Sequence, residues 1–314
     1  MSGTIIIPEA YQKVYGKNFE HQAQQKVSRM KQYSRVKTGC VGDSQTHNTF
    51  EEEDMVETTG QRMAATQISE MRGEVRNLFP RKFQSNKGQD QFDQALLAST
   101  VLPGSDIIMA QTMANNRKCD DVFVDGITGV NRVGVGVNAV DESLHADNVV
   151  PVDYVRTGAA APSNFTTGKA RYVKRLFEKL EMFGQDQKEA GAKICGAINA
   201  DMKDNIIGDP LVSDADKTRI NKLDDGDMVY WNGIHYIRTE RLPVDASDPN
   251  VVSAVFWISN LVQFDEWAHS VKRISERPDR SYAIQYYIEK MYGACRLEQR
   301  AVATVACQTN LFDE

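Results

Sequence analysis

The feature that most constrains the fold is a long polar stretch in the first third of the chain. Residues 40–95 are rich in threonine, glutamine and charged side chains and contain few apolar ones. Such a segment cannot bury enough apolar surface to form a core of its own. Ordered loops of this length are uncommon in compact domains unless they have a function. We therefore expect an extended excursion from a folded body, with a merely solvated loop as the alternative.

Charge is distributed unevenly along this excursion, which carries an acidic cluster first and a basic cluster later. Clusters of opposite sign suit two arms that bind complementary surfaces. The charged residues are therefore candidates for contacts with a partner. They are Glu51, Glu52, Glu53, Asp54, Arg72, Arg76, Arg81 and Lys82.

The segment before the excursion has the spacing of an amphipathic helix over residues 18–36, with Asn18 as a suitable N-cap. The other faces of this helix are too polar to form a core alone. We expect it to lie against its own domain or against a neighbouring chain, with Phe19 and Val27 as candidate contacts. The apolar stripe consists of Phe19, Ala23, Val27, Met30 and Tyr33.

An aspartate-rich stretch, "NRKCDDVFVDGITG", predicts the end of a long helix that opens at residues 103–105 and runs to about Gly126. At 100° per residue, Asp121 and Asp125 fall on the same side as Arg117 and Lys118. We expect ion pairs there, because i,i+4 pairing is the usual arrangement of such residues. The opposite, apolar side carries Ile108, Cys119, Val122 and Phe123.

The remaining segments predict a mixed α+β fold. Thr166 or Thr167 caps an amphipathic helix that Gly184 ends, and residues 192–210 read as a short strand followed by a helix. Asn232 and Gly233 separate two apolar runs as a type I′ hairpin requires. Later alternating segments, with a turn at residues 278–279, predict antiparallel strands at the end of the chain.

Composition excludes several classes of protein. A net charge of −6 argues against nucleic-acid binding as the main function, because such domains usually carry a basic excess. Five cysteines without C-x-x-C spacing indicate neither a disulfide framework nor a zinc site. No segment approaches the ~18 apolar residues of a membrane span, so we expect folding in the cytosol.

Motifs of catalysis and cofactor binding are also missing. The sequence contains no P-loop, nucleophile elbow, H-E-x-x-H or EF-hand pattern. We therefore expect no catalytic residues, metal or cofactor. An α+β enzyme whose site is the aspartate-rich helix stays an alternative, although such a site would normally bring an E-x-x-H motif or a nearby histidine.

Taken in order, these features resemble the tailed-bacteriophage major capsid proteins, whose fold is shared with the floor of the herpesvirus shell. The resemblance covers nearly the whole chain and depends on order and spacing more than on one motif. The stretches that carry it are "NRKCDDVFVDGITG", "FTTGKARYVKRLFEKLEMFG", "KICGAINADMKDNIIGD", "WNGIHYIRTERLP" and "RISERPDRSYAIQYYIEKMYGACRLEQRAVATVAC".

The resemblance implies a five-part organisation and a structural function. The chain would be a non-enzymatic subunit that assembles as hexamers and pentamers into an icosahedral head around double-stranded DNA. The N-terminal arm and the extended loop (E-loop) would lie over neighbouring subunits, and the aspartates would lie on the spine helix. Expected boundaries are 1–43 for the arm, 44–92 for the E-loop, 93–184 for the peripheral domain with the spine helix, 185–266 for the axial domain and 267–314 for the peripheral C-terminal strands.

The resemblance also implies partners and a location. A scaffolding region does not fit before the arm, so a separate scaffolding protein is expected, together with a portal and possible decoration proteins. Packaged DNA would be contacted only weakly, because the subunit is acidic. The subunit would assemble in the host cytoplasm and end in the virion capsid. Another virion component, a tail or decoration protein, is the alternative within the same class.

Overall fold

The computed structural model describes residues 24–50, 53, 55, 57, 60, 70–71, 73–89, 104–156, 158–208 and 230–311. Within them the chain forms three β-sheets and four α-helices. The α+β class expected from the sequence is confirmed. Among the described residues, no helix is long and apolar enough to cross a membrane.

The first sheet is a long, narrow platform of four strands in the order β1-β12-β13-β4. Its centre is an antiparallel hairpin whose turn is the short 3₁₀ helix η6 (Pro278–Arg280), as the sequence predicts. The parallel strand at one edge covers only the first residues of the hairpin, so the outer half of the hairpin projects beyond it. The strands are β1 (Arg35–Cys40), β12 (Val262–Arg277), β13 (Ala283–Arg296) and β4 (Arg81–Gln89).

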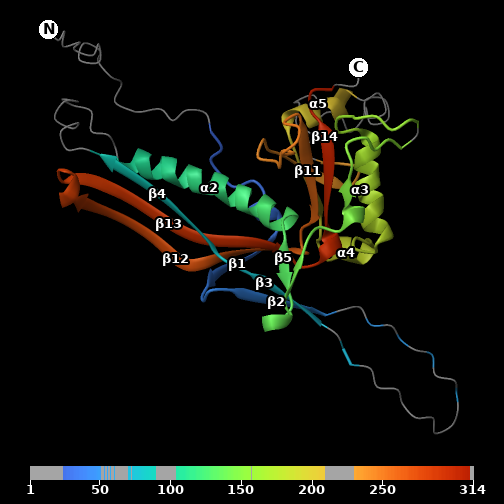
Figure 1. Cartoon of the computed structure of the whole chain (residues 1–314), viewed down its shortest axis with the longest axis horizontal. Coiled ribbons are helices and arrows are strands. Elements are labelled where there is room, and N and C mark those ends of the chain that lie inside the picture. Colours follow the sequence, from blue (N-terminus) through green and yellow to red (C-terminus); the bar gives the residue numbers. More distant parts are fainter. Residues whose placement is uncertain are drawn as a thin grey trace.

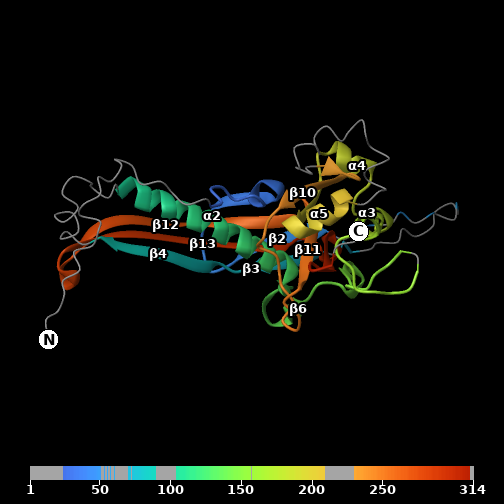
Figure 2. The ribbon, with the colours of Figure 1, turned by 90° about the horizontal axis from the view of Figure 1, so that it is seen from above.

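Helix α2 (Gly104–Thr128) lies along this platform (Figures 1 and 2). Its 25 residues span roughly 38 Å at 1.5 Å per residue. The side-chain amide of Gln111 donates to the carbonyls of Ser85, at 3.2 Å, and Tyr286, at 3.0 Å. Near the other end, a Cβ on Gly126 would lie 2.8 Å from the carbonyl carbon of Ala294, so the helix can approach β13 this closely only with glycine.

The second sheet has six strands and forms the compact half of the molecule. Every residue of its strand β8 is buried, because helices and loops cover the sheet. Helix α3 (Thr167–Lys179) packs Val173 and Phe177 into this core and is capped by the Thr166 hydroxyl. The other elements are β7 (Val149–Val150), β14 (Val302–Gln308), β11 (Val251–Ile258), β8 (Ile194–Ile198), β10 (Ile234–Arg238), β9 (Tyr230–Trp231), α4 (Gln185–Glu189) and α5 (Ala200–Gly208).

Local signals in this half are confirmed. Asn232 and Gly233 both have positive φ, of 54° and 80°, as a type I′ turn requires, and they join β9 to β10. Asn199 caps α5 by accepting from the Met202 amide at 2.8 Å. Helix α3 ends at Lys179, before the predicted Gly184, because Glu181 takes a left-handed conformation at φ 56°; Gly184 instead precedes α4.

The third sheet, in the order β2-β3-β5-β6, joins two strands of the excursion to the segment after α2. Strands β2 and β3 pair antiparallel from Gln45↔Leu78 to Phe50↔Gly73 and form the base of the excursion. The chain therefore leaves and re-enters the body through one two-stranded ribbon. The strands are β2 (Gln45–Phe50), β3 (Gly73–Leu78), β5 (Asn131–Val133) and β6 (Val140–Glu142).

The predicted helix over residues 18–36 is wrong for the part that the structure describes. Residues 24–30 are irregular, η2 (Lys31–Tyr33) is one 3₁₀ turn, and strand β1 follows directly. The helical spacing arose because Met30 is fully buried and Tyr33 packs against the same core. Val27, on the predicted apolar stripe, is 69% exposed, and Phe19 lies outside the described residues.

Candidate functional site

The base of the excursion has one face against the body and one face in solvent. Along β2, exposure alternates from residue to residue, and Thr46, Asn48 and Phe50 point outward. Phe50 is 73% exposed, which is unusual for a phenylalanine. Exposed apolar side chains that recur on one projecting element indicate a surface that binds another protein.

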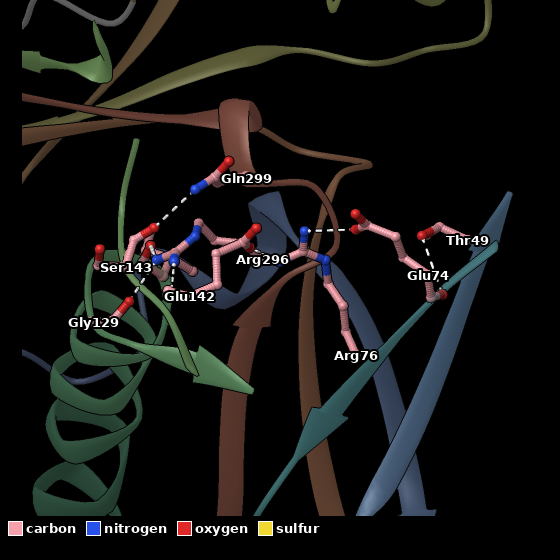
Figure 3. Close-up of polar contacts among 9 residues, drawn as sticks. Thr49, Glu74, Arg76, Gly129, Glu142, Ser143, Arg296 and Gln299 are labelled. Carbon is pink, nitrogen blue, oxygen red and sulfur yellow. Dashed lines mark hydrogen bonds and ion pairs between the residues drawn. The ribbon is translucent and has the colours of Figure 1, made fainter. Parts of the chain in front are cut away.

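A polar cluster of Arg76, Glu142 and Arg296, here called the polar junction, lies where strand β13, the end of α2 and the third sheet meet (Figure 3). Both arginines are buried, and Glu142 is partly exposed. Arg296 at the end of β13 is fully buried and donates to the carbonyls of Ile127 and Gly129, both at 2.6 Å. It also donates to the Glu142 carbonyl at 3.0 Å. The bonds to Ile127 and Gly129 satisfy carbonyls at the end of α2 that have no partner within the helix.

Electrostatics within the polar junction follow from its burial. Desolvation, with the nearby positive charge of Arg76, lowers the pKa of Arg296 to about 10, so the guanidinium stays charged at neutral pH. Arg76 is itself only 1% exposed and pairs with Glu142 at 2.6 Å and Glu74 at 3.0 Å. Arg76 was a candidate for contact with a partner, but the structure places it inside its own subunit, because these two carboxylates neutralise it there.

A contact between a histidine and a buried aspartate also attaches the excursion to the platform. His47 on β2 lies with Nε2 2.7 Å from Oδ2 of Asp265 on β12. Asp265 is fully buried, and its other oxygen accepts from Gln263 at 2.6 Å. Beneath the ribbon is a small apolar cluster that is separate from the main core. Its members are Cys40, Leu78, Trp267, Cys295 and Leu297.

On the platform, the carboxylate of Glu289 on β13 is contacted by side chains from three of the four strands, β4, β12 and β13. Lys82 of β4 pairs with it at 2.9 Å, and Tyr287 and His269 also contact its carboxylate. Hydrogen bonds from Tyr287 and Lys82 lower the pKa of Glu289 to about 2. Lys82 was another candidate contact. Its ammonium group pairs with Glu289 of the same subunit, although its side chain stays more than half exposed.

The aspartates of the predicted helix all lie on α2 and all have partners. Asp121 pairs with Arg241 at 2.7 Å and with Lys118 at 3.5 Å. Asp125 pairs with Arg81 at 3.0 Å, and both side chains are about half exposed. Arg117 departs from the expected helix pairing, because its guanidinium donates to the Gln24 side chain at 2.6 Å.

Asp120 has a different environment from these surface pairs, because its side chain is fully buried. It accepts four hydrogen bonds from residues 25–30, a segment that lies against α2. The sequence places Asp120 on the helix but gives no signal for these donors, which lie about 90 residues away.

The acidic end of the excursion falls mostly outside the described residues. Glu53 is described and exposed, and it has an interaction partner. The candidates that lie outside the description are Glu51, Glu52, Asp54 and Arg72.

Exposed apolar residues were not anticipated from the sequence. Met55 is fully exposed and Met71 is 62% exposed, both within the excursion. A second group lies around the turn between β5 and β6, where Val137 is fully exposed. The repeated glycines of "VGVGV" were the available signal, since they present valine side chains on a tight turn. The second group consists of Val130, Val135, Val137 and Val140.

No arrangement for metal or disulfide chemistry occurs in the described part of the chain. No group of three or more histidine, cysteine, aspartate or glutamate side chains there is placed to hold a metal ion. All five cysteines are free and buried. Burial raises the pKa of Cys119 to about 11, which keeps the thiol protonated and unreactive.

Comparison with known proteins identifies the family. The sequence profile of the phage capsid protein family matches residues 7–309, so the chain belongs to this family. No curated protein sequence matches the chain significantly.

Solved structures show the same fold at low sequence identity. The capsid asymmetric unit of cyanophage Pam1 aligns with a TM-score of 0.68 and 12% identity over 98% of this chain and 99% of that chain. The capsid of Ralstonia phage GP4 gives 0.65 and 9% over 98% of both chains. The capsid of a native GTA particle gives 0.64 and 13% over 97% of this chain and 96% of that chain.

Proposed function

We propose that this phage capsid protein is the major capsid protein of a tailed bacteriophage. It assembles with copies of itself, as hexamers and pentamers, into the icosahedral head that encloses double-stranded DNA. The observation that carries the proposal is the family match over residues 7–309, on a fold whose structural neighbours are phage and GTA capsids. The five-part division of the chain, from the N-terminal arm to the peripheral C-terminal strands, is part of the proposal.

Contacts between subunits would be made by the excursion, which corresponds to the E-loop. The excursion carries Phe50, Met55 and Met71 as exposed apolar side chains. Its acidic cluster at residues 51–54 has the opposite charge to the exposed basic side chains of the platform, such as Arg273 and Arg280. Charge complementarity of this kind sets register and speeds association more than it adds affinity.

A closed shell of such subunits is stable although each contact is modest. Every copy engages several neighbours at once, so the effective concentration of each further contact is high. Weak individual contacts also allow misplaced subunits to leave during assembly. A protein of this kind needs contact surfaces and a stiff body rather than a reaction centre.

A structural role without catalysis is further supported by the interactions of the aspartate side chains on α2. The aspartates of α2 are bound to Arg241, to Arg81 and to residues 25–30, rather than facing a substrate site. The rival hypothesis of an enzyme that uses the aspartate-rich helix therefore gains nothing from the geometry.

Other partners complete the proposal. A separate scaffolding protein and a portal would direct assembly in the host cytoplasm, and decoration proteins could bind the finished virion capsid. DNA would touch the inner wall only weakly and without specificity, because the chain carries a net charge of −6.

Size-exclusion chromatography followed by electron microscopy of the expressed protein tests the proposal. Purification should be carried out with and without the scaffolding protein of the same genome. Particles, rings or tubes are the expected result. A monodisperse monomer under both conditions would contradict a shell function.

A further inference from the structure

Residues 24–31, here called the arm root, lie against the C-terminal half of α2, and this segment is drawn in blue in Figure 1. Three helix residues on two successive turns hold them. Arg117 donates to the Gln24 side chain at 2.6 Å, and Asn116 donates to the Lys26 carbonyl at 2.8 Å. Asp120, one turn further on, is the third.

Asp120 receives donors from four residues of the arm root. Its Oδ1 accepts from the Ser28 hydroxyl at 2.6 Å and from the Met30 amide at 3.3 Å. Its Oδ2 accepts from the Arg29 amide at 3.1 Å and from the Gln25 side chain. An ionised carboxylate only accepts hydrogen bonds, so four donors match its full capacity.

The other contacts of the arm root lie mostly at its end, where Met30 is buried in the main core and Lys31 pairs with Glu266 at 2.6 Å. Between residues 24 and 30 the backbone forms no helix or strand, and Met30 is the buried side chain, while Val27 is exposed. Arg29 adds one bond from its guanidinium to the Arg238 carbonyl at 2.5 Å. A buried carboxylate is costly unless it is fully hydrogen-bonded, so Asp120 and the arm root depend on one another.

We propose that Asp120 is the positioning residue of the N-terminal arm. Its buried carboxylate fixes the point on α2 from which the arm leaves its own subunit. In the assembled shell this fixed exit reduces the conformational freedom that the arm must lose when it binds a neighbouring copy. The role in assembly rests on the proposed function, whereas the attachment of the arm root does not.

Limited trypsin digestion of the free wild-type subunit measures the attachment directly, with intact-mass spectrometry to identify cleavage after Lys26 and Arg29. D120N is nearly isosteric, but it turns an amide N–H₂ toward groups that are themselves donors. We expect cleavage at these two bonds to accelerate roughly tenfold or more, as local opening becomes easier. D121N is the matched control, because Asp121 is the next residue and pairs with Arg241 instead.

A second variant tests the same contact without changing α2, in case D120N does not fold. Q25A/S28A removes two donors from the arm root and leaves α2 intact, and it should accelerate the same two cleavages. Unchanged cleavage in both variants, relative to D121N, would overturn the attachment.

Assembly of the same three variants separates the positioning role from the proposed function. D120N and Q25A/S28A should give fewer closed particles and a broader range of diameters, while D121N behaves like the wild type. Faster cleavage with an unchanged yield and diameter of particles overturns the role in assembly and leaves the capsid function intact. A wild-type chain that never assembles contradicts the capsid function and with it this role, while the cleavage result still decides whether Asp120 holds the arm root.

Discussion

The two halves of the molecule are stabilised in different ways. The compact half, around the six-stranded sheet, buries large apolar side chains such as Phe177, Phe256 and Trp257 completely. The long half, made of the hairpin β12–β13, β4 and α2, is one sheet with one helix on it and exposes most of its outer residues. It is tied together by polar contacts such as those around Glu289.

This difference indicates which half of the molecule contacts neighbouring subunits. A half that completes its own core gains little from a partner, whereas a thin, extended half offers surfaces that a neighbour can cover. The excursion leaves from the junction between the two halves, and its exposed Phe50 and Met55 are side chains that contact with another copy would bury. Substitutions in the compact half should therefore lower the free energy of unfolding, whereas substitutions in the excursion should lower the yield of particles.

The largest effect on stability is expected from the compact half. Phe177→Ala should lower the free energy of unfolding by about 3 to 5 kcal/mol, because it leaves a cavity in a fully buried site. Denaturant unfolding measures the change. The control is Ile274→Ala on the long hairpin, where the side chain is 61% exposed and the change should stay within about 0.5 kcal/mol. Equal losses in the two variants would remove the contrast between the halves.

The second-largest loss of stability is expected from a substitution in the polar junction. Arg296→Met keeps much of the side-chain volume but leaves the carbonyls of Ile127 and Gly129 without donors, and we expect a loss of about 2 to 4 kcal/mol. Thermal or denaturant unfolding checks this value. Arg241→Met, at a partly exposed ion pair, is the matched control and should cost less than about 1 kcal/mol. A stable Arg296→Met protein would mean that the junction does not hold the halves together.

Charge reversal in the excursion should separate assembly from stability. Glu51, Glu52 and Glu53 changed together to lysine should alter the free energy of unfolding by less than about 1 kcal/mol, because charges outside a packed core contribute little to stability. The same change should strongly reduce the yield of particles, because the acidic cluster would then repel a basic neighbour. The neutral variant with three glutamines should give an intermediate yield. Wild-type particle yield from the lysine variant would contradict the expected contact.

The smallest effect concerns acid stability of the platform. The pKa of Glu289 falls from 4.5 to about 2 on folding, so its ionised form contributes stability above pH about 4.5 that is lost as the pH falls through about 2. Glu289→Gln lacks this contribution. The difference in denaturant midpoint between the two proteins should therefore shrink steadily between these pH values. A constant difference would show that the carboxylate does not titrate with folding.

Sequence alone predicts the elements whose signals are local. The Thr166 cap, the apolar face of α3 and the Asn232-Gly233 turn depend on neighbours within a few residues, and all three are confirmed. The helix predicted over residues 18–36 is wrong in its described part. Met30 is buried because it packs against the body of the protein, and this burial does not require a helix.

The polar contacts of the candidate site could not be predicted in the same way. His47 and Asp265 are 218 residues apart, and Arg296 reaches carbonyls about 168 positions earlier. Burial of Arg76 likewise depends on Glu142, which another strand supplies. Composition identified the excursion as too polar to fold alone, but not which of its charges are used within the subunit.

The most direct test of the account is a cryo-electron microscopy map of assembled wild-type particles in which single subunits can be traced. We predict that the part of the excursion beyond the β2–β3 ribbon, residues 51–72 of each copy, lies on an adjacent subunit, with the acidic cluster against basic side chains of that neighbour. A shell in which this segment folds back onto its own subunit would contradict the central claim.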